Sequence, residues 1–535
     1  MPSKSLLQRL KIQHLVNPWE RAMEQLYRAR NANLPRGTNP AVISLQYVDA
    51  PFYYCLFAEI VTALREKRPV VAYGYTPQSL RPGSSKSVRD FLRTRLFWNY
   101  VFNIKWAKLY RAFCDRLAWR GASIMAPWKE VVFFLRAVRI WRGLRTKKQL
   151  AALKLRGILV GDLVIDSFLR FKPSPVMILN DLYLVVVLHQ TQRDLEKAIG
   201  FFSTFRPKLH LTSYTTYIQH GIASRVALSF GTRVVSFGNY QDLSKTITPD
   251  SMGHARDFSR YAQDFAKLDN QAEKLALADA SIRKRLGGEI DNAIGYMQAS
   301  AYEVKTANVP DVRGALVMFL HDFYDSSHVY DWMVFEDLWE WICFTVEHCE
   351  KNEIPLFVKP HPNQLAGSEN DFGKLQKLYP NMQMISPDVT NRQLAEAGMV
   401  CAVTVRGSVA SEMVYLGIPS ISAGNNPHVS FDTFLTPRTP EEYTRLLDGY
   451  RSLPRDPARM KEQACAFYFM HNLNQTKDEM ALRDFAAQWN TFLAFSEDLE
   501  KIDFDTVREA FEEMRSYPAF QSFIDDLNGT LSVRC

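Results

Sequence analysis

One segment of the chain combines a glycine turn, a short helix and a carboxylate in an order that suits a phosphate-bearing ligand. The apolar run 399–405 predicts a strand that ends at a turn of Arg406, Gly407 and Ser408 and leads into a short helix. Gly407 allows the backbone to approach a ligand closely, and Ser408 is a natural N-cap, so the helix N-terminus favours an anion. Glu412 follows one helical turn later, where a carboxylate can accept hydrogen bonds from a ribose diol. The pattern predicts a nucleotide site.

Two further polar side chains follow the apolar run 354–358, which predicts another strand. Lys359 and His361 each precede a proline, Pro360 and Pro362, and proline keeps the preceding residue in extended geometry. Ligands of open α/β sheets bind beyond the carboxyl ends of the strands, so both side chains can meet the same phosphate as the helix N-terminus. The alternative is that this segment only ends a strand and that His361 makes a local contact.

Together these motifs resemble a known family. Lys-Pro-His-Pro, followed further along by Gly-Ser, a helix and a Glu, is similar to the donor half of the capsule polysaccharide biosynthesis glycosyltransferases. That family includes bacterial transferases of Kdo and is related in fold to CMP-sialic acid transferases. The resemblance implies that His361 and Ser408 hold the nucleotide phosphate and that Glu412 meets the ribose. Many relatives have a Ser-Ser or Ser-Thr pair at the turn, whereas Ser408 lies between Gly407 and Val409.

A third match, residues 319–328, resembles the first strand and loop of the same donor domain. The resemblance covers about 310–440, and the N-terminal half matches loosely through 157–162 and 217–231. It implies an α/β fold of two Rossmann-like domains facing a cleft, the GT-B architecture. It also implies metal-independent transfer from a nucleotide sugar, best CMP-linked, which is a co-substrate and not a cofactor. The implied acceptor is a lipid-linked or polysaccharide glycan.

Catalytic groups are expected in the loop after the strand that ends near residue 320. Sugar transfer needs a stabilised leaving phosphate and either a base or a carboxylate nucleophile. The candidates are Asp322, Asp325 and His328, with His321 beside them. Capping of a following helix explains Asp325 almost as well.

The N-terminal half offers two more candidates. Asp49 follows the first predicted strand, and His220 lies in Gln219-His220-Gly221. The alternative for His220 is a histidine on a helix that packs locally.

No metal site is expected. A metal-dependent transferase with a single Rossmann domain needs Asp-X-Asp after a strand, and the only such triplet, 503–505, leads into Thr506-X-X-Glu509, a helix-capping pattern. The seven cysteines include no CxxC pair, which argues against zinc and a disulfide framework and favours a reducing compartment.

Length and composition suit a large α/β enzyme. A chain of 535 residues with 47% apolar content can bury two cores. Three domain ranges are predicted: an acceptor-side Rossmann-like domain at 1–307 with a helical insertion at 86–156, a donor domain at 308–480, and C-terminal helices at 481–535 that pack back toward the first domain. Strands are expected at 41–48, 69–73, 176–179, 183–188, 209–213 and 233–237, with helices at 52–67 and 215–230.

The insertion 86–156 is strongly basic. It contains eighteen Lys or Arg against three Asp or Glu, together with five of the ten tryptophans, while the whole chain carries a net charge of +8. Basic residues alternating with Trp and Phe at helical spacing are typical of helices on anionic membrane surfaces. Ordinary packed helices and a nucleic-acid patch are the alternatives, and nucleic acid is disfavoured because no DNA- or RNA-binding motif is present. With no long apolar run, we expect a cytoplasmic enzyme, peripheral on the inner membrane.

Three functions therefore remain open. The first is a glycosyltransferase that uses a CMP-activated acidic sugar such as Kdo in capsule or lipopolysaccharide synthesis. The second is a teichoic-acid-type polyol-phosphate transferase with a CDP-activated donor, for which Gln219-His220-Gly221 is a partial match to the required motif. The third is a non-catalytic component of polysaccharide assembly or export.

Overall fold

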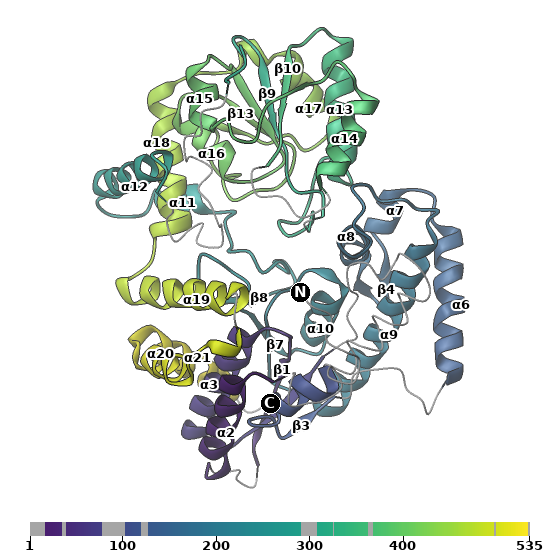
Figure 1. The fold of residues 1–535 in the computed structure, drawn as a ribbon, viewed down its shortest axis with the longest axis vertical. Helices are drawn as coiled ribbons and strands as arrows, with labels where there is room; N and C mark the ends of the chain where they lie inside the picture. The colour runs from purple at the N-terminus through teal and green to yellow at the C-terminus, as the bar shows by residue number, and fades with distance from the viewer. Residues whose placement is uncertain are drawn as a thin grey trace. The chain divides into compact units, whose positions relative to one another are not determined.

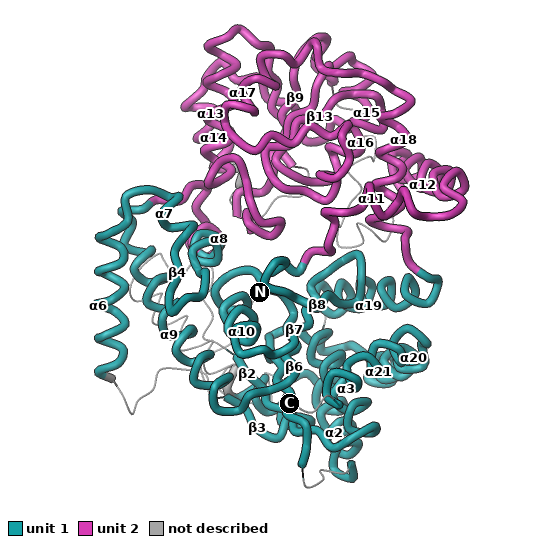
Figure 2. The backbone as a smooth tube through the Cα atoms, turned by 180° about the vertical axis from the view of Figure 1, so that it is seen from behind, with its two compact units in different colours: residues 1–167, 179–254, 476–535 teal, residues 168–178, 255–475 magenta. Residues whose placement is uncertain are grey.

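The computed structural model describes residues 16–34, 39–76, 102–118, 127–289, 308–324, 326–361, 368–496 and 499–532. The chain forms two compact units (Figure 2). The first comprises residues 1–167, 179–254 and 476–535, and the second comprises 168–178 and 255–475. The expected boundary near residue 307 differs from this division, because helix α12 (Gln271–Leu286) packs on helix α18 (Pro457–Tyr468) and both lie in the second unit.

The first unit is built on a six-stranded sheet in the order β3-β2-β1-β6-β7-β8. All neighbouring strands are parallel except β7 and β8, which are antiparallel. The chain thus moves outward from β1 in one direction and then in the other, which is the strand order of the Rossmann fold. The strands are β1 (Ala41–Gln46), β2 (Val70–Tyr75), β3 (Arg116–Leu117), β6 (Leu209–Thr212), β7 (Arg233–Ser236) and β8 (Lys245–Ile247), with a separate hairpin of β4 (Lys154–Leu155) and β5 (Ile158–Leu159).

Helices surround this sheet (Figure 1). They are α2 (Pro18–Ala32), α3 (Pro51–Lys67), α5 (Ala107–Tyr110), α6 (Pro127–Gly143), α7 (Lys147–Ala151), α8 (Gly161–Phe171), α9 (Leu182–Phe205), α10 (Tyr217–Ser229), α19 (Lys477–Phe495), α20 (Phe504–Ser516) and α21 (Pro518–Ser532), with a π-helix at Phe102–Trp106 and a 3-10 turn at Leu499–Lys501. The helices α5, α6 and α7 lie in the described parts of the basic insertion.

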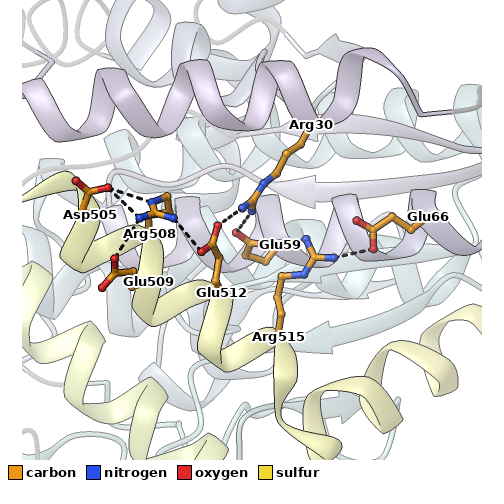
Figure 3. Close-up of polar contacts among 8 residues, drawn as sticks. All are labelled: Arg30, Glu59, Glu66, Asp505, Arg508, Glu509, Glu512 and Arg515. Atoms are coloured by element: carbon orange, nitrogen blue, oxygen red, sulfur yellow. Dashed lines mark hydrogen bonds and ion pairs between the residues drawn. The ribbon is translucent and has the colours of Figure 1, made fainter.

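The C-terminal helices α19, α20 and α21 belong to the first unit and pack on α3. Figure 3 shows an ion-pair network that joins α20 to α2 and α3. The buried Glu59 carboxylate contacts Arg30 and Arg515, each at 3.2 Å. Burial raises the pKa of Glu59, and the two guanidinium groups oppose that rise. A carboxylate taken out of water at this position needs both cations, so the network ties the end of the chain to its beginning.

The second unit repeats the same strand order, β11-β10-β9-β12-β13-β14, with every neighbouring pair parallel. Residues alternate across strand β9, because Leu316 and Met318 join one apolar cluster whereas Val317 and Phe319 join another. The sheet is therefore buried on both faces, as parallel sheets are.

Short strands alternate with helices along the second unit. The strands are β9 (Leu316–Phe319), β10 (Leu356–Lys359), β11 (Gln383–Met384), β12 (Cys401–Thr404), β13 (Ser420–Ser422) and β14 (Phe434–Leu435). The helices are α11 (Tyr261–Phe265), α12, α13 (Leu338–Lys351), α14 (Ser368–Leu378), α15 (Asn391–Glu396), α16 (Ser408–Tyr415), α17 (Pro440–Asp448) and α18, with a 3-10 turn at Tyr450–Ser452 and a π-helix at Phe469–Leu473.

The two sheets confirm the predicted fold class, α/β with two Rossmann-like domains. The predicted strands at 176–179 and 183–188 are wrong, because residues 176–179 lie in the connection between α8 and α9 and residues 182–205 form helix α9. Most of the apolar run 183–188 is buried on that helix, and a short continuous apolar run does not distinguish a buried strand from a buried helix. Within the described residues, every helix is too short or too polar to cross a membrane.

Candidate nucleotide site at the edge of the second sheet

The second sheet reverses its winding direction between β9 and β12, which are neighbouring strands. Loops that leave adjacent strands at such a point diverge to opposite faces, and the crevice between them is where ligands of open α/β folds bind. His321 follows β9, and the turn of Arg406, Gly407 and Ser408 follows β12. The fold therefore brings together two segments that lie about 85 residues apart in the chain.

His321 holds the turn after β12 in place. Its Nε2 atom lies 3.2 Å from the backbone nitrogen of Arg406 and 3.0 Å from Oγ1 of Thr404. Since the backbone N–H can only donate, Nε2 accepts, and His321 is neutral. Burial lowers the pKa of His321 well below its usual value, and the neighbouring Arg406 and His361 lower it further. The structure thus gives His321 a positioning role that the sequence did not predict.

Gly407 is the residue that lets helix α16 begin at this edge. Its φ angle of 106° is one that side-chain-bearing residues rarely adopt. Ser408 is the first residue of α16 and Gly407 is its N-cap, so the prediction of Ser408 as N-cap is wrong. Gly407 and Ser408 are both exposed, and the N–H groups of Ser408 and Val409 have no hydrogen-bond partner among the described residues. These donors and the helix dipole can receive an anion.

Lys359 is the most unusual group at this edge. Its side chain is 3% exposed, yet within the described ranges its ammonium makes no hydrogen bond or ion pair. Burial lowers the pKa of Lys359 to about 8, although the charges of Glu412 and Asp388 act in the opposite direction. A buried ammonium without a hydrogen-bonded partner is costly to the fold. An anionic ligand would supply the missing partner.

Glu412 lies close enough to Lys359 to influence its pKa, and it also contacts residues from two other helices. Oε1 of Glu412 is 3.2 Å from Nη2 of Arg285, and Oε2 accepts a hydrogen bond from Asn391 at 3.2 Å. All three side chains are buried. The sequence did not point to Arg285 or Asn391, because Arg285 comes from α12, more than a hundred residues before Glu412, and no local pattern marks it.

Arg406 was predicted to bind nucleotide, and its side chain contacts the loop after β9. Nη1 donates to the carbonyl oxygen of Ser327 at 2.7 Å and Nη2 donates to that of Ser326 at 2.6 Å. The guanidinium is also 5.7 Å from the ring centre of Tyr330. Two of its donors are therefore used to order the backbone of the loop.

The predicted catalytic residues and His361 lie in the loops after β9 and β10. Oδ1 of Asp322 accepts a hydrogen bond from the backbone of Tyr324 at 2.8 Å, as in a turn. His328 lies further along the same loop and is half-buried, and Asp325 lies outside the described residues. His361 follows β10 beside the site and lowers the pKa of His321 electrostatically.

Asp503, from the triplet 503–505, lies in the first unit. It accepts a hydrogen bond from the backbone of Thr506 at 2.8 Å and caps α20. This contact supports its interpretation as a structural residue.

In the first unit, the corresponding edge carries Asp49 after β1 and His220 in the first turns of α10. Both are partly exposed. His220 contacts Gln46, the last residue of β1, across the neighbouring strands β1 and β6. No three His, Cys, Asp or Glu side chains in the parts of the chain that are described form a group able to hold a metal ion.

Comparison with known proteins found no matching family model and no curated protein similar in sequence. Among solved structures, the chain is similar to a UDP-GlcNAc 2-epimerase from Methanocaldococcus jannaschii in complex with UDP-GlcNAc and UDP, at 10% identity over 80% of this chain and 98% of that chain, with a TM-score of 0.24. It is similar to an O-GlcNAc transferase from Thermobaculum terrenum, at 11% identity over 92% and 74%, with a TM-score of 0.27. It is also similar to a UDP-glucosyltransferase from Polygonum tinctorium, at 11% identity over 94% and 100%, with a TM-score of 0.19. TM-scores this low carry no information on activity, and the evidence for the fold is the strand order of the two sheets.

Proposed function

We propose that this chain is a glycosyltransferase that binds the phosphate of a nucleotide-activated sugar at the carboxyl edge of the second sheet. The observation that carries the proposal is Lys359, a buried ammonium with no hydrogen bond or ion pair among the described residues. It lies at the end of β10, beside the strand pair whose loops form the crevice. A bound phosphate would give this cation the partner that it lacks among the described residues.

The arrangement suits departure of a nucleotide from a sugar. Negative charge builds up on the leaving phosphate as the glycosidic bond breaks, and preorganised donors at that place lower the barrier. Lys359 supplies a cation, and the N-terminus of α16 supplies backbone N–H groups and a dipole. His361 follows the same strand as Lys359 and can add a third donor.

The identity of the donor rests on the resemblance of the Lys359–His361 and Gly407–Glu412 motifs to the capsule polysaccharide glycosyltransferases. We propose a CMP-linked acidic sugar such as Kdo, transferred without a metal to a lipid-linked or polysaccharide acceptor. Asp322, Asp325 and His328 remain the proposed catalytic candidates. The second candidate function is a polyol-phosphate transferase with a CDP-activated donor, as in teichoic-acid synthesis. The third is a non-catalytic component of polysaccharide assembly or export.

The proposal is tested by isothermal titration calorimetry of CMP, CDP, UDP and GDP without divalent metal. We expect selective CMP binding that Lys359→Met weakens about 100-fold, the effect of losing a charged hydrogen bond. Lys377→Met is the matched control, because Lys377 is an exposed lysine on α14. Preference for CDP would favour the polyol-phosphate donor, and preference for UDP or GDP would keep the site but change the donor. Absence of nucleotide binding would refute the proposed function.

A membrane acceptor would require a surface for the bilayer, and helix α6 offers one on the outside of the first unit, alongside α9 (Figures 1 and 2). Trp128, Val131 and Leu135 are 58–63% exposed, although apolar residues of a helix normally face the core. With Arg139 and Arg142, which are also exposed, they share one face at helical spacing. Apolar side chains beside arginines on one helix face suit an anionic bilayer.

Vesicle co-sedimentation tests this location. We expect binding to vesicles that contain anionic lipid, weak binding to neutral vesicles, and loss of binding in Trp128→Ser/Leu135→Ser. Leu378→Ser is the matched control, because Leu378 is 56% exposed on α14. Equal sedimentation with neutral and anionic vesicles would exclude an electrostatic membrane surface.

A further inference from the structure

Two side-chain contacts join helix α12 to helix α16, whose N-terminus lies at the candidate nucleotide site. Nη2 of Arg285 is 3.2 Å from Oε1 of Glu412, and the hydroxyl of Tyr415 donates to Oδ1 of Asp279 at 2.6 Å. Glu412 and Tyr415 are three residues apart in the chain, so they lie on one face of α16. Both helices also pack on α18 (Figure 1). A helix from before the second sheet in the chain therefore supports the helix at the site.

The ion pair of Arg285 and Glu412 is buried. The two side chains are 7% and 6% exposed, and the second carboxylate oxygen of Glu412 accepts a hydrogen bond from Asn391 at 3.2 Å. Well-packed apolar side chains of similar volume often stabilise a fold as well as a buried ion pair does. Attachment of α12 to α16 alone therefore does not require these charges, and a second role for the pair is sought in its electrostatic effect.

The group affected by this pair is the buried ammonium of Lys359. The negative charge of Glu412 raises the pKa of Lys359 against the larger effect of burial, so the two groups interact. Asp388 acts in the same direction, but it is exposed and its charge is screened by water. A buried carboxylate without a cation would interact strongly with Lys359, because the local dielectric constant is low. The contact with Arg285 reduces that interaction.

We propose that Arg285 is a positioning residue for phosphate binding: it pairs with Glu412 and so leaves the ammonium of Lys359 to bind the phosphate of the nucleotide. An anion that approaches Lys359 then meets a carboxylate whose charge is already compensated, and repulsion between the two anions is small. Arg285 acts through Glu412 and does not itself contact the ligand. The proposal deepens the proposed function and rests on it for the identity of the anion as a nucleotide phosphate.

The effect on Lys359 is measured without nucleotide, by ¹³C NMR titration of the full chain labelled at lysine Cε, with Lys359→Met to identify the signal. In Arg285→Met, Glu412 loses its cation, and we expect the pKa of Lys359 to rise above its wild-type value of about 8. In Arg285→Met/Glu412→Gln the added negative charge is gone, and the pKa should fall back to the wild-type value or below. An equal pKa in the wild type and Arg285→Met would overturn the proposal.

Calorimetry with CMP measures the consequence for the ligand. Arg285→Met should weaken binding about tenfold, because the uncompensated carboxylate of Glu412 attracts Lys359 and repels the phosphate. Arg285→Met/Glu412→Gln should bind CMP nearly as well as the wild type. The double variant removes both charges of the pair, so it tests the proposal even if Arg285→Met does not fold. A double variant that binds CMP tenfold more weakly than the wild type would overturn the proposal and would indicate that Glu412 itself contacts the nucleotide.

Tyr415→Phe is the matched structural control. It removes the other contact between α12 and α16, the hydrogen bond to Asp279, without removing a charge. We expect it to change neither the pKa of Lys359 nor the affinity for CMP. If Tyr415→Phe weakens CMP binding as much as Arg285→Met does, Arg285 acts only by attaching α12, and the proposal is wrong. The NMR titration needs no nucleotide, so its failure is distinguishable from failure of the proposed function, which absence of nucleotide binding by the wild type would show.

Discussion

The two sheets have the same strand order, but the edges at which they reverse direction carry different chemistry. In the second unit, the buried cations Lys359 and Arg285 lie near an exposed helix N-terminus. In the first unit, the corresponding place holds the polar side chains of Gln46, Thr212 and His220, which contact one another. Strand order thus determines where a ligand can bind, and the residues after the strands determine which ligand.

The largest expected effect comes from Lys359, the buried cation at the second edge that has no hydrogen bond or ion pair in the described part of the chain. Lys359→Met should lower nucleotide affinity about 100-fold, or ~3 kcal/mol, without lowering the free energy of unfolding. Methionine fills the space of the lysine and removes the cost of burying its charge. Calorimetry and urea unfolding measure the two quantities. A variant that loses stability together with affinity would show that Lys359 is structural.

The second prediction compares the two networks by removing one member of each. Arg285→Met leaves the Glu412 carboxylate buried without its cation, and should cost about 3 kcal/mol of unfolding free energy. Gln46→Met removes only neutral hydrogen bonds and should cost ~1–2 kcal/mol. Urea unfolding of both variants tests the order. Equal losses would mean that the charged and neutral networks are equivalent in stability.

The third prediction concerns the turns that precede α16 and α10. Gly407→Ala should cost about 2 kcal/mol, because alanine is strained at a φ of 106°. Tyr217→Gly should cost less, since relief of the strained φ of 58° offsets the lost contacts of the ring. Thermal unfolding gives both values. A larger loss for Tyr217→Gly would show that packing of Tyr217 outweighs its strain.

The smallest expected effect is the change of nucleotide affinity and of stability with pH. The pKa of Lys359 is about 8, so its ammonium is mostly charged at pH 7 and mostly neutral at pH 9. Nucleotide affinity should therefore fall about tenfold between these values, because one contact loses its charge. Stability should move in the opposite direction: the folded pKa is lowered, the unfolded chain binds more protons, and this group contributes stability as pH rises above 8.

Both pH trends should be absent in Lys359→Met, which serves as the control. Titrations at pH 7, 8 and 9 on the wild type and the variant measure the first trend, and urea unfolding over the same range measures the second. An unchanged pH profile in the variant would assign the dependence to another group.

Much of the second edge could be predicted because its motifs are local. The glycine before a helix, the lysine at the end of a strand and the proline that follows it act through neighbouring backbone, so the described segments 354–361 and 399–416 were placed correctly in outline. The cap was misassigned to Ser408 because a serine before an apolar helix satisfies the same pattern as a glycine that takes a positive φ. The strand predicted at 183–188 failed because most of this run is buried on α9 and a short apolar run has no period that separates a strand from a helix, and the strand predicted at 176–179 is a partly exposed connection.

The sequence by itself determined the two α/β domains, the glycine turn before helix α16 and the exposed basic helix α6, since these depend on residue types at short spacing. Only the tertiary structure decided which charges are paired and which are not. Glu412 forms an ion pair with Arg285 from α12, Lys359 is left without a hydrogen-bonded or ion-paired partner among the described residues, and Gln46 contacts His220 from 174 residues away. These outcomes depend on contacts between segments far apart in the chain, and such contacts exist only once the sheets have formed.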